Sequence, residues 1–153
     1  MACDGRAAVE AAIPHRPPFL FVDRILARDG SSIVTEWDVR PELDCFRGHY
    51  PGDPILPGVL VCEFAFQSAA ILLSGGGAPA PEGAVPVVTR IEDARFRRAV
   101  RPGDVLRAEL AVEESLANAR WLSAKVTSGG GAVARLRFAV ALAVPARGGA
   151  EGA

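Results

Sequence analysis

The sequence has few cysteines, few aromatic residues and almost no net charge, and each scarcity argues against a class of protein. Its 153 residues include Cys3, Cys45 and Cys62, which form no CxxC pair. An odd number of scattered thiols fits neither a disulfide framework nor a zinc site, and favours a reducing, cytoplasmic compartment. A formal net charge of −1 gives no overall field for nucleic acid or membrane. We therefore expect structural thiols, no bound metal and no nucleic-acid partner.

Long uninterrupted apolar runs are also missing. Residues 1–18 contain no apolar core of signal-peptide length, and the longest apolar segment carries Glu63 and Gln67. We therefore expect neither secretion nor membrane insertion. The length suits one domain, which we place over residues 1–144, followed by a flexible C-terminal tail over residues 145–153.

What the chain does contain is one long apolar helix among strands. Pro57 at the first helical position and Gly58 introduce this helix, which is apolar around nearly its whole circumference and therefore buried on most sides. The remaining pattern predicts a short helix capped by Asp4 and ended by Pro14, strands near 19–25 and over 31–39, one helical turn within 41–50, and strands over 85–100, 105–115, 120–127 and 132–144, joined as hairpins in sequence order. This predicts an α+β fold in which a curved antiparallel sheet wraps a long central helix. The open sheet edges predict at least a dimer.

Two side chains in the segment 46–73 are candidates for chemistry. His49 lies in a turn-rich loop before the helix, and Glu63 stands among apolar helical residues. Alone, His49 is equally well explained by hydrogen bonding to neighbouring backbone. Glu63 is costly to bury without a partner, and its structural alternative is an interfacial ion pair with an arginine. Together they provide an imidazole that titrates near neutral pH and a carboxyl group that can hold or release a proton.

The start of the long helix adds a third chemical element. The N–H groups of Gly58 and Val59 would be free in the first turn, and with the helix dipole they can polarise a carbonyl oxygen. An acid, a base and such a donor are what β-elimination next to a thioester requires. The sequence has no nucleophile elbow and no cluster with metal-ligand spacing, so we interpret Cys62 as a packing residue.

Three segments resemble successive signatures of one enzyme family. They are HRPPFLFVDRI, FRGHYPGDPILPGVLVCEFAFQ and IEDARFRRAVRPGD, in that order, and the similarity extends over residues 13–144. They are similar to the 3-hydroxyacyl-[acyl-carrier-protein] dehydratases of fatty-acid synthesis, FabZ type. The resemblance implies the hotdog fold, an antiparallel sheet around a long helix. It also implies a hydro-lyase that converts (3R)-3-hydroxyacyl thioesters on acyl carrier protein to trans-2-enoyl thioesters without a cofactor.

The same resemblance implies roles for particular residues. His49 would be the base at C2, and Glu63 would act on the C3 hydroxyl. Gly58 and Val59 would bind the thioester oxygen, and Gln67 would support the glutamate. It also implies a homodimer with shared active sites, His49 of one subunit facing Glu63 of the other, and assembly of such dimers into hexamers. Glutamate at position 63 favours the FabZ type over the relatives that also isomerise, which carry aspartate.

Some positions depart from the family pattern. Phe64 and Phe66 replace smaller or more flexible residues, and Val87 and Val88 stand where the family has an aromatic pair. These four residues would line the acyl tunnel, with an effect of Phe64 and Phe66 on the dimer contact as the alternative, so the preferred chain length is left open. The changes would also suit a specialised polyketide or polyene pathway.

Four arginines lie within the third signature. Arg95, Arg97, Arg98 and Arg101 are explained equally well as a solvated strand face and as a basic rim that contacts acidic carrier protein. His15 and Arg16 lie in the first signature and are interpreted as structural. Two other functions remain open: a hotdog acyl thioesterase, and a non-catalytic dehydratase-like subunit that binds acyl chains.

Overall fold

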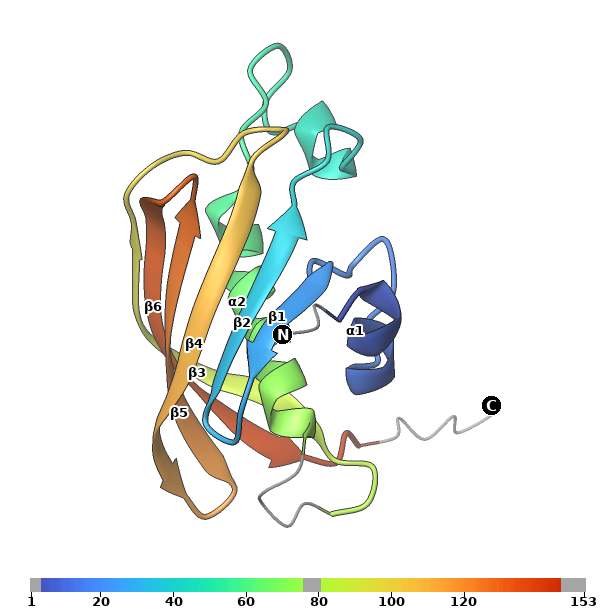
Figure 1. The fold of residues 1–153 in the computed structure, drawn as a ribbon, viewed down its shortest axis with the longest axis vertical. Coiled ribbons are helices and arrows are strands. Elements are labelled where there is room, and N and C mark those ends of the chain that lie inside the picture. Colours follow the sequence, from blue (N-terminus) through green and yellow to red (C-terminus); the bar gives the residue numbers. More distant parts are fainter. Residues whose placement is uncertain (1–3, 76–80, 147–153) are drawn as a thin grey trace, which may run out of the picture.

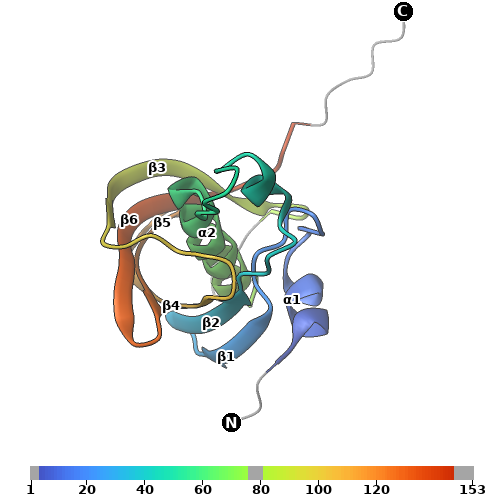
Figure 2. The same ribbon diagram turned by 90° about the horizontal axis from the view of Figure 1, so that it is seen from above.

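The fold is a six-stranded antiparallel sheet curled around one long helix, seen in a computed structural model that describes residues 4–75 and 81–146 (Figures 1 and 2). Its elements are α1 (Arg6–Ala12), β1 (Arg24–Arg28), β2 (Ser32–Asp38), the 3-10 helix η1 (Asp44–Arg47), α2 (Gly58–Ser74), β3 (Val85–Phe96), β4 (Val105–Leu116), β5 (Ala119–Ser128) and β6 (Gly131–Ala143). The strand order is β1-β2-β4-β5-β6-β3. This confirms the predicted α+β hotdog arrangement.

Helix α2 forms the core because most of its surface is apolar. Figure 2 shows it inside the curve of the sheet, with α1 outside. Phe64 is fully buried, and its ring centroid lies 5.8 Å from that of Trp37, which in turn lies 4.9 Å from that of Phe21. The less buried side of α2 carries Val59, Glu63 and Phe66, spaced by four and three residues and therefore on one face.

Strand β3 does not form a hairpin with β4, so the prediction of hairpins in sequence order was wrong at this point. It pairs with β6 instead, and β4 pairs with β2 and β5. The predicted turn at 101–104 exists, because Asp104 N–H donates to the carbonyl of Arg101. The residues before that turn cross the end of the sheet, with Arg97 N–H bonded to Val133 O and Leu56 N–H bonded to Val100 O. Strand β3 is thus an edge of the sheet.

The N-terminal predictions need three corrections. Asp4 does not cap α1; Gly5 is the N-cap, and the backbone of Asp4 pairs with that of Ile25. The apolar run 19–22 is not a strand, and β1 begins only at Arg24. Pro57 is the N-cap of α2, one residue before the position predicted for it. The first correction follows from a backbone contact with Ile25, which the local pattern does not reveal.

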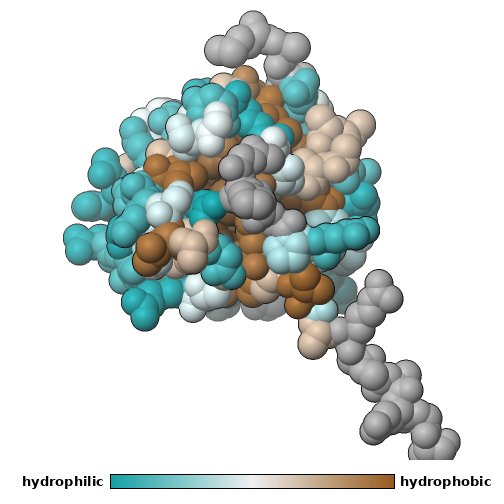
Figure 3. Space-filling model, turned by 90° about the horizontal axis from the view of Figure 1, so that it is seen from below, coloured by the Kyte–Doolittle hydropathy of each residue, from teal (hydrophilic) through white to brown (hydrophobic). Residues whose placement is uncertain are grey.

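The other elements lie close to their predicted positions, including the turn of helix η1 and strands β2, β4, β5 and β6. Most of the predicted tail, residues 147–153, and Cys3 lie outside the described residues. Within the described part of the chain, no helix is long and apolar enough to cross a membrane. Figure 3 shows the end of the molecule opposite η1, where exposed apolar side chains alternate with polar ones.

Candidate active site

The loop after η1 holds His49 through one ring nitrogen. His49 Nδ1 lies 2.7 Å from the backbone carbonyl oxygen of Ile55, and the ring stacks on Tyr50 with centroids 4.1 Å apart. A carbonyl oxygen can only accept, so Nδ1 carries the hydrogen of this bond. In the neutral imidazole the lone pair is then on Nε2. His49 is therefore oriented as a base whose Nε2 can take a proton.

A pocket of about 450 Å³ joins His49 to the start of α2. A Cβ atom added at Gly58 would lie 3.1 Å from the ring of Phe96, which explains the glycine at this position. Val59 follows it and is 73% exposed. The pocket is lined by His49, Ile55, Leu56, Gly58, Val61, Phe96, Arg97, Arg98, Ala99, Val100 and Val133. It places a proton acceptor beside the free N–H groups of a helix N-terminus.

Glu63 is held by an amide one helical turn further on. Gln67 Nε2 donates to Glu63 Oε1 at 3.0 Å and lies 3.2 Å from the carbonyl oxygen of Phe19. Gln67 Oε1 accepts from the N–H of Phe21 at 2.8 Å, and Gln67 is only 1% exposed. Two backbone groups of the segment before β1 therefore fix the amide that contacts Glu63. The same bonds explain why residues 19–22 do not pair as a strand.

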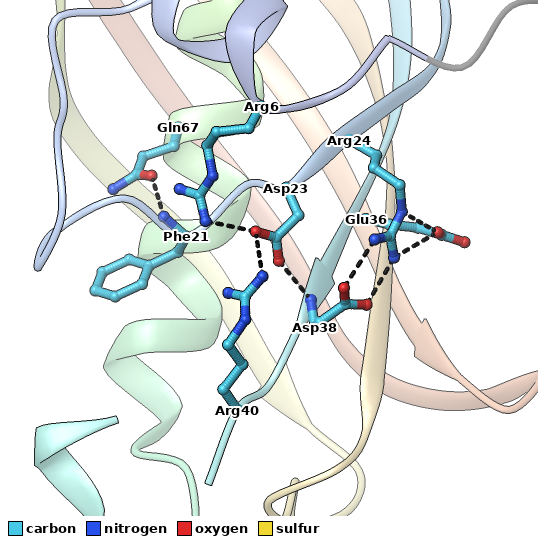
Figure 4. A network of polar contacts seen from close by, with 8 residues as sticks. All are labelled: Arg6, Phe21, Asp23, Arg24, Glu36, Asp38, Arg40 and Gln67. Carbon is cyan, nitrogen blue, oxygen red and sulfur yellow. Dashed lines mark hydrogen bonds and ion pairs between the residues drawn. The ribbon is translucent and has the colours of Figure 1, made fainter. Parts of the chain in front are cut away.

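The segment before β1 is anchored by a buried carboxylate, Asp23 (Figure 4). Asp23 Oδ1 accepts from Arg6 at 2.6 Å and from Arg40 at 3.0 Å, and Oδ2 accepts from the N–H of Asp38 at 2.8 Å. Beside it, Arg24 donates to both carboxylate oxygens of Asp38 and keeps the pKa of that carboxyl below its ordinary value. This network ties α1 and β2 to the segment that contacts Gln67.

His15, which the sequence indicated only as a structural residue, lies close to Glu63. Its Nε2 lies 3.9 Å from Glu63 Oε1, and the side chains of His15 and Glu63 are 31% and 22% exposed. The available sequence signal was slight: His15 is one of two histidines and lies in the first of the three signature segments.

One chain does not bring His49 and Glu63 together. In the part of the chain that the structure describes, no hydrogen bond or ion pair joins them, and Glu63 does not line the pocket of His49. Glu63 instead faces outward on the side of α2 that also carries Val59 and Phe66. The structure thus places the two residues in separate surroundings.

The predicted tunnel residues are brought together only in part. Phe64 lies in the core beside Trp37, whereas Phe66 is half-buried against Phe138, with ring centroids 4.9 Å apart. On β3, Val87 is exposed and Val88 packs against the core. A tunnel that uses all four predicted residues remains a prediction.

The four predicted carrier-contact arginines are exposed around the end of β3 and the following loop. Arg95 pairs with Asp93 at 3.2 Å, Arg98 with Asp104 at 3.7 Å and Arg101 with Asp53 at 2.6 Å. Arg97 has no ion pair among residues 4–75 and 81–146, and it lines the pocket of His49.

Neither described cysteine is set up as a nucleophile. Burial raises the pKa of the Cys45 thiol and that of the Cys62 thiol above their ordinary value, so little of either is thiolate at neutral pH. Among the same described residues, no three His, Cys, Asp or Glu side chains lie close enough together to hold a metal ion. A hollow of about 480 Å³ on the outer face of the sheet, beside Glu109, Lys125 and Arg135, contains no predicted site residue.

The sequence matches a known domain family over most of its length. Residues 13–136 match the FabA-like domain family. A 3-hydroxyacyl-[acyl-carrier-protein] dehydratase FabZ from Acidiphilium cryptum is 40% identical over 135 residues, which cover 87% of this chain and 81% of that protein. The protein of the same name from Herpetosiphon aurantiacus is 39% identical over 133 residues, which cover 85% and 93%.

Solved structures are similar in fold. The dehydratase heterocomplex ApeI:P from Xenorhabdus doucetiae matches with a TM-score of 0.73 at 13% identity, covering 88% of this chain and 90% of that one. The uncharacterised protein PH1136 from Pyrococcus horikoshii matches with a TM-score of 0.65 at 16% identity, covering 84% and 88%. These identities support a common fold alone. The match over residues 13–136 and the relatives near 40% identity show that the chain belongs to the FabA-like family, as a 3-hydroxyacyl-[acyl-carrier-protein] dehydratase of the FabZ type.

Proposed function

We propose that this protein dehydrates (3R)-3-hydroxyacyl thioesters carried on acyl carrier protein, giving trans-2-enoyl thioesters and water. The observation that carries the proposal is the imidazole of His49. Its Nδ1 is bound to Ile55 O, and it shares a pocket with Gly58 at the N-terminus of α2. A base and a carbonyl-polarising donor next to one another suit removal of a proton α to a thioester.

In this mechanism each group has one task. The N–H groups of Gly58 and Val59 bind the thioester oxygen, which acidifies the protons at C2. His49 Nε2 takes one C2 proton. Glu63, held by Gln67, protonates the C3 hydroxyl, which leaves as water. No cofactor takes part, because the proton removed and the proton delivered balance the reaction.

We propose that each active site combines His49 of one subunit with Glu63 of a second copy. Two features support this. Strand β3 is the last strand of the sheet, with Ile91 51% and Phe96 50% exposed, and an open edge of this kind suits pairing with an identical strand. Val59 is exposed and Glu63 is partly exposed on the less buried side of α2, where a partner could reach them. Assembly of these dimers into hexamers, as the family resemblance implies, remains a prediction.

Acyl carrier protein is the proposed carrier, and Arg97 is its strongest candidate contact. Arg97 lies beside the His49 pocket without an intrachain ion pair among the described residues, so its charge is available to an acidic partner or a phosphate. Arg95, Arg98 and Arg101 would take a smaller part, because each already contacts a carboxylate. The choice of pathway, fatty-acid or specialised polyketide synthesis, and the cytoplasmic location remain sequence-based predictions.

The role assignment is tested by hydration of a crotonyl or longer enoyl thioester, the reverse reaction. We expect His49→Ala and Glu63→Gln each to abolish turnover while the elution volume of the oligomer stays unchanged. Turnover that persists in either variant would contradict the roles. Release of free thiol from a saturated acyl thioester by the wild-type protein, without turnover of the enoyl thioester, would identify a thioesterase instead.

The shared site is tested by mixing the two inactive variants. After subunit exchange, random dimers of His49→Ala and Glu63→Gln chains would contain one native site in each mixed dimer, about a quarter of all sites. We expect about a quarter of wild-type activity. No recovery, with subunit exchange verified by mass spectrometry, would contradict a site formed across two chains.

A further inference from the structure

We propose that His15 is a positioning residue for Glu63, acting as a neutral imidazole whose Nε2–H is directed at Glu63 Oε1. This inference rests on the proposed function, in which Glu63 protonates the C3 hydroxyl. It assigns His15 a task in the reaction beyond holding the segment between α1 and β1.

The geometry around Glu63 supports this assignment. In the described part of the chain, the side chains that approach its carboxylate are Gln67, at 3.0 Å, and His15, at 3.9 Å. Both approach the same oxygen, Oε1. The His15 distance is about 1 Å longer than an N–H···O bond, and both side chains are partly exposed, so small rotations would close it. Catalytic hydrogen bonds are often long until substrate binds.

The other ring nitrogen of His15 fixes the tautomer. Nδ1 is buried and has no hydrogen-bond partner among the described residues. Of the two neutral tautomers, the one with a hydrogen on Nδ1 would leave a buried donor without an acceptor. The lower-energy form has the lone pair on Nδ1 and the hydrogen on Nε2, facing Glu63. This is the opposite tautomer to that of His49.

The backbone around His15 is rigidly held. Arg16 Nη1 donates to the carbonyl oxygens of Ile13 at 2.8 Å and His15 at 2.6 Å, and Nη2 donates to that of Glu10 at 2.9 Å. These bonds close the end of α1 onto the following residues. His15 can therefore present its Nε2 from a fixed support.

The chemical consequence is that the two oxygens of Glu63 differ. Donors from Gln67 and His15 both meet Oε1, which leaves Oε2 to hold the proton and face the C3 hydroxyl of the substrate. A carboxyl group whose two oxygens have different partners in this way has one orientation for proton transfer. Loss of the His15 donor would allow the group to rotate, which lowers kcat more than substrate binding.

The first experiment compares His15→Leu with His15→Gln in the enoyl thioester assay. The amide nitrogen of glutamine can replace Nε2 as a donor, whereas leucine fills a similar volume but has no donor. We expect kcat to fall about tenfold in His15→Leu with KM changed less than about twofold, and His15→Gln to recover most of the loss. Equal kcat for wild type and His15→Leu, or equal losses in both variants, would overturn the proposal.

The second experiment is made on the wild-type protein, and a variant serves only to assign its signals. The chain has two histidines, so ¹⁵N NMR of labelled wild-type protein gives two resolvable rings, assigned with His49→Ala. We expect opposite neutral tautomers, Nε2–H for His15 and Nδ1–H for His49. A hydrogen on Nδ1 of His15 would overturn the proposal. Wild-type protein without dehydratase activity would instead contradict the proposed function, and the spectrum would still test the His15 tautomer.

Discussion

Two parts of the candidate site are held in place by different means. The Glu63 half comprises Glu63, Gln67 and the segment 15–23, and its key bond joins Gln67 to the backbone of Phe21, 46 residues away in sequence. The His49 half comprises His49, Ile55 and Gly58, and its key bond joins His49 to a carbonyl only six residues further on. The Glu63 half therefore depends on the tertiary fold, whereas the His49 half is mostly local. Variants in the first should cost stability, and variants in the second should cost activity with little loss of stability.

The largest loss of stability is expected from Asp23→Ala. Asp23 is buried and accepts from Arg6, Arg40 and the N–H of Asp38, so its removal leaves three donors without their acceptor. We expect the free energy of unfolding to fall by about 3 kcal/mol in urea titrations, the low end for a broken buried pair because both arginines are partly exposed. Asp44→Ala is the matched control, since its ion pair with Arg47 is fully on the surface and should contribute about 0 to 1 kcal/mol. Similar losses in both variants would contradict the anchoring role of Asp23.

A direct comparison of the two halves is given by Gln67→Leu and His49→Ala. Leucine at position 67 leaves the buried N–H of Phe21 and the partly buried carbonyl of Phe19 unpaired, and we expect a loss of about 2 kcal/mol. His49→Ala removes one partly exposed hydrogen bond, at about 1 kcal/mol. Chemical unfolding and the enoyl thioester assay should rank them in opposite orders, with His49→Ala the more stable and the less active. If the variant that is less stable were also the less active one, the two halves would not differ in the way proposed.

Within the His49 half, Gly58→Ala tests the close packing at the start of α2. The added Cβ would lie 3.1 Å from the ring of Phe96, so the ring or the helix must shift by a few tenths of an ångström. We expect a loss of about 1 kcal/mol and a fall in kcat/KM, because the N–H groups of the first turn move with the helix. Gly48→Ala, at the end of η1, is the control, because an added Cβ there meets nothing within 4 Å. The contact predicts that Phe96→Leu restores stability to the Gly58→Ala chain; no restoration would assign the loss to another cause.

The sequence predicted the helix, the strands after it and the candidate residues, because these follow from local patterns. The apolar circumference of α2 and the alternation in β4 and β5 required no knowledge of distant contacts. The partner of β3 could not be predicted in this way, since the path of residues 97–104 depends on bonds to Val133 and Leu56. Likewise, residues 19–22 read as a strand, but the N–H of Phe21 and the carbonyl of Phe19 bond to the side chain of Gln67 on α2.

The same limit applies to the site. His49 and Glu63 stand out in sequence because a turn-rich loop and an apolar helix surround them. His15 does not, because its significance comes from an orphaned Nδ1 and from a carboxylate that lies 48 residues further along the chain. A lone histidine beside prolines gives no local sign of the group it will face. Contacts of this kind are properties of the fold.

The smallest effect is expected at the turn between β1 and β2, which lies near Leu72 and Leu73 at the C-terminal end of α2. The backbone N–H of Ser31, with the hydroxyl and N–H of Ser32, lowers the pKa of Asp29 from 3.8 to about 2. Because the folded pKa lies below the unfolded one, the carboxylate stabilises the fold above about pH 4, and this contribution is lost as the pH falls towards 2. The difference in unfolding midpoint between wild type and Asp29→Asn should therefore be constant at neutral pH and shrink below pH 4, with turnover at pH 7 unchanged. A difference in unfolding midpoint that persists at pH 2 would contradict this. It would mean that the turn depends on the hydrogen-bonding shape of the side chain and not on its charge.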